Sequence, residues 1–231
     1  MTLKLLGTVA LCATALTGGT AQAALINSYD FDGSYADTLG AGNDLVASGG
    51  TISGGEYIFS GNQGLRLTDA LPSTTDYAIE LGFSVTDSVG GYNKLIDFQD
   101  LASDLGLYIY SGTLDFYTTG AGGGSISVGQ DVVVGFARSG GVLSYYLDGA
   151  LIASAADTAN QAVSGANVLN FFEDDFATSQ SESFAGAVDY IRIHDNISTF
   201  GAEPAPAVPL PAGLPLLLGG FGLLGLMRRK S

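Results

Sequence analysis

A row of tyrosines beside one carboxylate is the first candidate binding surface in this chain. We expect two strands, 105–110 and 113–118, to form a hairpin around a Ser-Gly turn. One face of this hairpin then carries Tyr108, Tyr110, Asp115 and Tyr117, and the other carries Leu107, Ile109, Leu114 and Phe116 toward the core. Aromatic rings beside hydrogen-bonding groups suit the mixed apolar and polar faces of sugars. Exposed cross-strand tyrosines are also common in strands that bind nothing, so both readings stay open.

A second candidate is Asp189, near the start of the last predicted strand. Strand alternation places it on the same face as Ile191 and Ile193, which predicts an inward-pointing carboxylate. A buried carboxylate costs several kcal/mol unless it is compensated. The compensation could be backbone N–H donors, a cation, or an ion pair with Arg192 or Arg66.

Acidic loop residues form the third candidate. They are Asp97, Asp100, Asp104, Glu173, Asp174 and Asp175. Clustered carboxylates could bind surface calcium or act as a glycosidase pair. We expect instead that these are solvated loop charges. The single histidine, His194, alternates with Ile193 in a strand, and the chain has no Gly-x-Ser-x-Gly motif that would supply the nucleophile of a hydrolytic triad.

The charge of the chain limits its partners. It has 23 acidic and 8 basic residues and a formal net charge of −15 at pH 7. Such a surface repels phosphate backbones and predicts no nucleic-acid partner. It is compatible with divalent cations, and equally with the general acidity of an exported protein.

The elements that must position these residues are strands. Residues 77–86 alternate between apolar and small or polar side chains, which predicts a half-buried strand. Asp148 and Gly149 give a two-residue hairpin signal that pairs Leu147 with Ala150 and Tyr145 with Ile152. Short strands separated by glycine-rich turns predict an all-β, antiparallel two-sheet sandwich over residues 24–199.

The two ends of the chain are predicted to be delivery segments. Residues 1–23 have a basic start, an apolar stretch and a small-x-small site, which predicts a signal peptide cleaved between Ala23 and Ala24. The only cysteine, Cys12, would leave with it, so the mature body would hold no disulfide.

The C-terminal segment contains a proline-spaced motif, an apolar stretch and a basic end. A Pro/Ala linker covers 200–212, and an apolar helix with a basic end is predicted over 213–231. The linker ends in Val208, Pro209, Leu210, Pro211 and Ala212, and the basic end is Arg228, Arg229 and Lys230. A helix of this length spans a bilayer only marginally, which suits a temporary membrane anchor. An ordinary anchor explains the apolar run but not the VPLPA motif.

This C-terminal pattern resembles the PEP-CTERM type of sorting signal of Gram-negative bacteria, in its VPLPA-CTERM variant. The resemblance implies processing by an exosortase-type membrane transpeptidase and transfer of the body to the cell surface or its matrix.

The body resembles LamG-like jelly-roll domains of the concanavalin A-like lectin/glucanase superfamily. The matching segments include YAIELGFSV, LSYYLDGALIAS and FAGAVDYIRIHD, although the chain has no tryptophan. Such modules often hold a structural calcium between the first and last strands. The resemblance therefore implies a possible calcium site formed by Asp30, Asp32 and Asp189.

These features together predict an exported, non-enzymatic sandwich that binds glycans or matrix polysaccharide, with possible calcium support. The glucanases in this superfamily resemble laminarinases and carry an ExDxxE-type motif, which is absent here. The first alternative is a glycan hydrolase or lyase with another carboxylate pair. The second is a purely structural component of the extracellular matrix.

Overall fold

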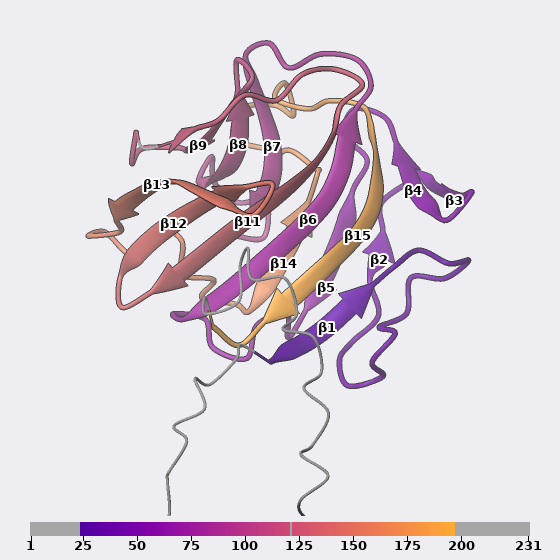
Figure 1. The fold of residues 1–231 in the computed structure, drawn as a ribbon, viewed down its shortest axis with the longest axis horizontal. Helices are drawn as coiled ribbons and strands as arrows, with labels where there is room; N and C mark the ends of the chain where they lie inside the picture. The colour runs from indigo at the N-terminus through magenta and orange to yellow at the C-terminus, as the bar shows by residue number, and fades with distance from the viewer. Residues whose placement is uncertain (1–23, 121, 197–231) are drawn as a thin grey trace, which may run out of the picture.

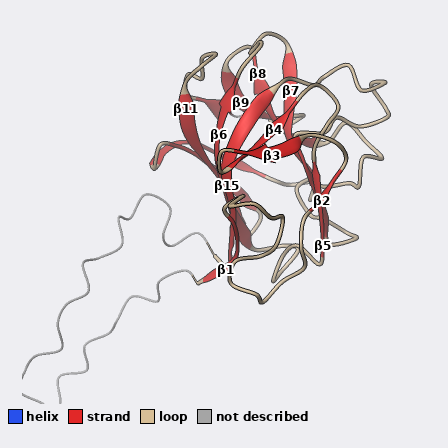
Figure 2. Cartoon of the chain, turned by 90° about the vertical axis from the view of Figure 1, so that its right-hand side faces the viewer, coloured by secondary structure: helices blue, strands red, loops and turns tan. Residues whose placement is uncertain are grey.

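The computed structural model describes residues 24–120 and 122–196, and every regular element in these residues is a β-strand (Figures 1 and 2). The expected signal peptide, linker, sorting motif and C-terminal helix lie outside the described residues. No helix that could cross a membrane occurs in 24–120 or 122–196. The strands are β1 (Leu25–Tyr29), β2 (Val46–Ala47), β3 (Thr51–Ser53), β4 (Glu56–Phe59), β5 (Leu65–Thr68), β6 (Tyr77–Val85), β7 (Tyr92–Asp97), β8 (Gly106–Tyr110), β9 (Thr113–Phe116), β10 (Gly122–Gly123), β11 (Asp131–Ser139), β12 (Val142–Leu147), β13 (Ala150–Ala156), β14 (Val168–Phe171) and β15 (Gly186–His194).

The strands form two antiparallel sheets that pack face to face, which confirms the predicted two-sheet sandwich (Figure 1). The eight-stranded sheet has the order β13-β12-β11-β6-β15-β4-β3, and β1 also pairs with β15. The seven-stranded sheet has the order β10-β9-β8-β7-β14-β5-β2. Pairing of β1 with β15 brings the two ends of the described body together, and the Ala24 N–H donates to the Asp195 carboxylate at 2.8 Å.

Alternating side chains from both sheets fill the core. The inward residues of β6 are the predicted ones, Tyr77, Ile79, Leu81, Phe83 and Val85, and all are buried. Phe136 on β11 stacks on Phe116 of β9 across the two sheets, with ring centroids 5.6 Å apart. The core therefore directly supports the hairpin that carries the candidate tyrosines.

Two hairpin turns match their sequence signals. Ser111 and Gly112 both have positive φ, as do Asp148 and Gly149, and this is the requirement of a type I′ turn. The second hairpin pairs Leu147 with Ala150 as predicted.

The predicted pairing of Tyr145 with Ile152 is wrong. A bulge between Tyr145 and Tyr146 shifts the register by one residue, so Tyr145 faces Ala153. An extra residue in one strand moves every pair beyond it, and nothing in the local alternation marks the position.

Candidate functional site

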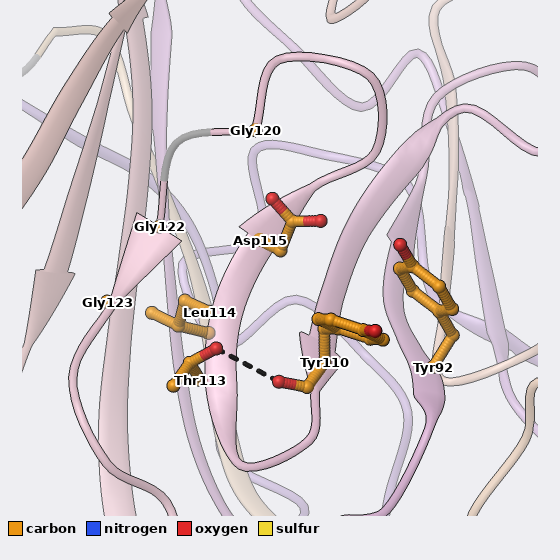
Figure 3. Close-up of a pocket in the computed structure, with 8 residues that line it drawn as sticks. All are labelled: Tyr92, Tyr110, Thr113, Leu114, Asp115, Gly120, Gly122 and Gly123. Atoms are coloured by element: carbon orange, nitrogen blue, oxygen red, sulfur yellow. Dashed lines mark hydrogen bonds between the residues drawn. The ribbon is translucent and has the colours of Figure 1, made fainter.

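A hollow of about 410 Å³ lies at one edge of the seven-stranded sheet, on its outer face (Figure 3). It is formed by strands β7, β8, β9 and β10 and the turn before β10. Its lining residues are Tyr92, Tyr110, Thr113, Leu114, Asp115, Gly120, Gly122 and Gly123. Sugar-sized ligands are commonly held by such mixtures of aromatic rings, backbone groups and a few polar side chains.

Two stacked tyrosines form one wall of the hollow. Tyr92 on β7 pairs with Tyr110 on β8, and their ring centroids are 4.2 Å apart at an interplanar angle of 27°. Tyr110 is 43% exposed, so its ring is available to a ligand. Tyr117 meets the Tyr92 ring edge-on at 5.9 Å. Tyr92 could not be predicted as part of the site, because no signal in the sequence identified β7 as the neighbour of the predicted hairpin.

The predicted hairpin face is confirmed in its register but not in its exposure. Tyr108 faces Asp115 and Tyr110 faces Thr113, as expected. Tyr108, however, is fully buried, and its hydroxyl donates to an Asp104 carboxylate oxygen at 2.8 Å. The rings of Tyr92 and Tyr117 pack against it, so Tyr108 supports the hollow from beneath and does not line it.

Of the described residues that line the hollow, Asp115 is the one with a charged side chain. Burial raises the pKa of its carboxyl. Its cross-strand neighbours are Tyr108 on one side and Gly122 on the other. Within residues 24–120 and 122–196, no donor or cation pairs with its carboxylate.

Gly122 keeps the space beside Asp115 open. A Cβ at this position would lie 1.6 Å from the carbonyl oxygen of Leu114, so β10 can pair with β9 only if this residue is glycine. Bare backbone therefore forms the wall of the hollow next to the carboxylate, and its amide groups can meet a polar ligand.

Next to the hollow, the segment between β14 and β15 is hydrogen-bonded to β7. The backbone N–H of Lys94 donates to the Glu182 carbonyl, and the Phe172 N–H donates to the Leu95 carbonyl. The same segment contributes two carboxylates to a buried charge cluster.

Lys94 is the centre of that cluster and is fully buried. Its Nζ contacts the carboxylate of Asp175 directly and lies 3.6 Å from Asp174 Oδ1 and 3.8 Å from Asp97 Oδ2. All three carboxylates are fully buried. The expectation that these acidic residues are solvated loop charges is therefore wrong for Asp97, Asp174 and Asp175. Asp97 lies on β7 with Lys94, and the segment after β14 brings Asp174 and Asp175 to the same buried lysine. Burial raises the pKa of Asp97 even with Lys94 nearby.

The remaining acidic loop residues have other partners. Asp100 forms an exposed ion pair with Arg66 at 3.1 Å. Asp104 accepts a hydrogen bond from Tyr108 and pairs with Glu182. Burial, with repulsion from Asp104 second, raises the pKa of Glu182 to about 7. The two carboxyl groups can pair only while one of them holds a proton.

This pair predicts a pH dependence of stability. Because the pKa of Glu182 is higher in the folded than in the unfolded chain, folding takes up a proton between about pH 4.5 and 7. The contribution of Glu182 to the free energy of unfolding is present at low pH and is lost as the pH rises through 7. We expect Glu182→Gln to reduce the fall in melting temperature between pH 5 and 8. Glu173→Gln, in the same segment, is the control and should keep the wild-type slope, whereas equal slopes in all three proteins would contradict this assignment.

The predicted inward orientation of Asp189 is wrong. Asp189 is exposed, because a bulge between Val188 and Tyr190 breaks the alternation on which the prediction rested. Its neighbour is Glu56, whose pKa is raised by burial and by the nearby charge of Asp189. Neither Arg192 nor Arg66 pairs with it among the ion pairs of the described residues.

The proposed calcium ligands are not gathered into one site. Asp32 is exposed, and Asp30 accepts hydrogen bonds from Ser28 and Thr38 at the surface. No group of three or more histidine, cysteine or acidic side chains in the described residues has a geometry suited to a metal ion. Asp30, Asp32 and Asp189 therefore do not form the expected cluster.

The buried carboxylate of the N-terminal segment is Asp37. Burial alone would raise the pKa of Asp37, but backbone N–H donors from Ser28, Leu39, Ala41 and Gly42 outweigh it and lower the pKa. The role of this residue is to hold the loop after β1. His194 is half-buried at the end of β15, where burial lowers its pKa.

Comparisons with known proteins identify the fold. No protein-family model matches the chain, and no curated protein does. One similar structure is Domain 4 of AbnA, a GH43 extracellular arabinanase from Geobacillus stearothermophilus, in complex with arabinotriose. It is 20% identical to this chain and has a TM-score of 0.58, and the match covers 76% of this chain and 94% of that domain. A sialidase from Trypanosoma rangeli, in complex with 2,3-difluorosialic acid, is 14% identical with a TM-score of 0.59 over 78% of this chain. This chain spans about a third of that sialidase. At these identities the likeness shows the fold, a two-sheet antiparallel sandwich.

Proposed function

We propose that this protein is a non-enzymatic glycan-binding module whose ligand lies in the hollow of β7, β8, β9 and β10. The observation that carries the proposal is the stacked Tyr92–Tyr110 pair beside Asp115 at an open surface. Sugar rings offer C–H faces to aromatic rings and hydroxyl groups to carboxylates and backbone amides. The likeness to an arabinanase domain solved with arabinotriose supports this proposal.

Truncating the exposed ring tests the proposal. We expect Tyr110→Ala to weaken retention on polysaccharide at least tenfold, which corresponds to about 1.4 kcal/mol, because a ligand would lose the accessible face of the stacked pair. The measurement is a pull-down with a panel of insoluble polysaccharides, quantified against competing arabinotriose.

Val46→Ala is the matched control for this experiment. Val46 is 65% exposed on β2, at the opposite edge of the same sheet, so its truncation should leave retention unchanged. Retention by Tyr110→Ala at the wild-type level would reject the hollow as the glycan site.

We propose a location at the cell surface from the predicted segments at the two ends of the chain. The predicted signal peptide and the predicted VPLPA-type tail suit export, processing by an exosortase-type transpeptidase and display at the cell surface. Intact masses of the protein in membrane and secreted fractions would test both processing sites together. An unprocessed chain in the cytosol would contradict this part of the proposal.

A glycan hydrolase is the second candidate, and Glu182 is the residue that favours it. A carboxyl group with a pKa of about 7 can act as a general acid at neutral pH. Its hydrogen-bonded partner Asp104 is closer than the separation of about 5 Å or more between glycosidase carboxyls, which argues for binding over hydrolysis. Release of reducing ends that is abolished by Glu182→Gln would establish the enzyme. If the protein neither releases reducing ends nor is retained on any polysaccharide, the remaining candidate is a structural role in the matrix.

A further inference from the structure

The charge distribution at the hollow restricts which glycans can enter it. Among the residues that the structure describes, Asp115 is the one carboxylic acid in the lining, and no lysine or arginine lines the hollow. Lys94, on the neighbouring strand β7, is fully buried and held by Asp97, Asp174 and Asp175. The whole chain carries a formal charge of −15. A uronate, sialylated or sulfated glycan would therefore approach this surface against electrostatic repulsion.

No described residue supplies a counter-charge to the carboxylate of Asp115. Its strand neighbours are the buried Tyr108 ring and the side-chain-free Gly122, and no described residue donates to it. Burial accounts for its raised pKa, and no cation among the described residues offsets the cost of burying the charge. A ligand with a positive charge would supply the missing partner, whereas a hydroxyl group would supply only a neutral hydrogen bond.

The aromatic residues around Asp115 favour the same ligand charge. Tyr92, Tyr110 and Tyr117 lie on the same outer face, and Asp115 is diagonal to Tyr110 across the β8–β9 pair. The π-faces of tyrosines attract ammonium groups, and the attraction grows when the site is partly shielded from water. The stacked rings also present a flat apolar surface that matches the face of a sugar ring.

We propose that the hollow recognises a cationic saccharide, a polymer of amino sugars with free ammonium groups, in which Asp115 pairs with the ammonium and the Tyr92–Tyr110 pair packs on the sugar ring. This inference rests on the proposed glycan-binding function and names its ligand class. An N-acetylated polymer has the same ring but no charge, so it would lose the ion pair while keeping the stacking contact.

The test compares two probes of equal length, an oligomer of glucosamine and the corresponding oligomer of N-acetylglucosamine. Binding to the full chain is measured by titration calorimetry at mildly acidic pH and low salt. We expect the glucosamine oligomer to bind at least tenfold more tightly. Asp115→Asn should remove this preference without abolishing binding of the N-acetylated oligomer. Asp131→Asn, which removes the same charge from an exposed position on β11, should leave the preference intact.

The outcomes separate this inference from the function on which it rests. Equal affinity for the two oligomers, or a preference that survives in Asp115→Asn, would overturn the cationic ligand while leaving glycan binding in place. A lysine-rich peptide that binds as tightly and competes would show that the site takes any ammonium group, and would overturn the saccharide. Failure of both oligomers and of every polysaccharide in the panel to bind would reject glycan binding itself.

Discussion

Replacing Lys94 by methionine is expected to lower the free energy of unfolding by about 3–5 kcal/mol. Lys94 is fully buried, and its ammonium group is shared by Asp97, Asp174 and Asp175. Methionine has a similar length but leaves three carboxylates without their cation. Some of them must then take up protons or pull the segment after β14 away from β7. Denaturant unfolding followed by circular dichroism would measure the loss.

The double variant Lys94→Met/Asp175→Asn separates charge from packing. Asp175 is the carboxylate in direct contact with the ammonium, so its neutralisation should recover part of the stability lost in the single variant. If Lys94→Met is as stable as the wild type, the described cluster does not hold this segment in place.

Truncation of Phe136 to alanine is expected to cost about 3–5 kcal/mol through the cavity it leaves. The Phe136 ring is fully buried between the sheets and contacts the rings of Phe98, Phe116 and Tyr145. The same denaturant experiment measures this effect. Phe176→Ala is the matched control, because the Phe176 side chain is 67% exposed and its loss should change stability by less than about 0.5 kcal/mol.

Phe136→Ala should also affect the candidate site. Phe116 is the inward neighbour of Asp115 on β9, and it stacks on Phe136. A cavity behind Phe116 should loosen the β8–β9 hairpin and weaken glycan retention in Phe136→Ala at temperatures where the chain is still folded. A Phe136→Ala variant as stable as the control would contradict the core packing described above.

The fold could be predicted from local patterns because strand alternation and type I′ turns depend on neighbouring residues. The inward set of β6 and the turn at Ser111 and Gly112 were both found in this way. The bulges could not be predicted, among them those at Tyr145/Tyr146 and Val188/Tyr190. Each bulge inserts one residue into a strand and changes the alternation of the side chains there. As a result, Asp189 is exposed and Tyr145 pairs with Ala153.

The candidate site could be predicted only in part, because the rest depends on contacts between distant segments. Tyr110 and Asp115 belong to one hairpin, so their proximity follows from its turn. Tyr92 joins them through the pairing of β7 with β8. Tyr108 is buried against the rings of Tyr92 and Tyr117, and the segment after β14 supplies two of the carboxylates around buried Lys94. Alternation within a strand shows which face a side chain takes, and it does not show whether another segment covers that face.

The most direct test of the central claim, that the hollow of β7–β10 is the ligand site, is an amide chemical-shift map of the full chain. The chain is titrated with the glucosamine oligomer and, separately, with arabinotriose. The account predicts that the shifts concentrate on Tyr92, Tyr110, Thr113, Asp115 and Gly122 for at least one of these ligands, with Val46 at the far edge of the sheet unchanged. Binding whose shifts fall on the other sheet or on β2 and β5, with the hollow unaffected, would contradict it.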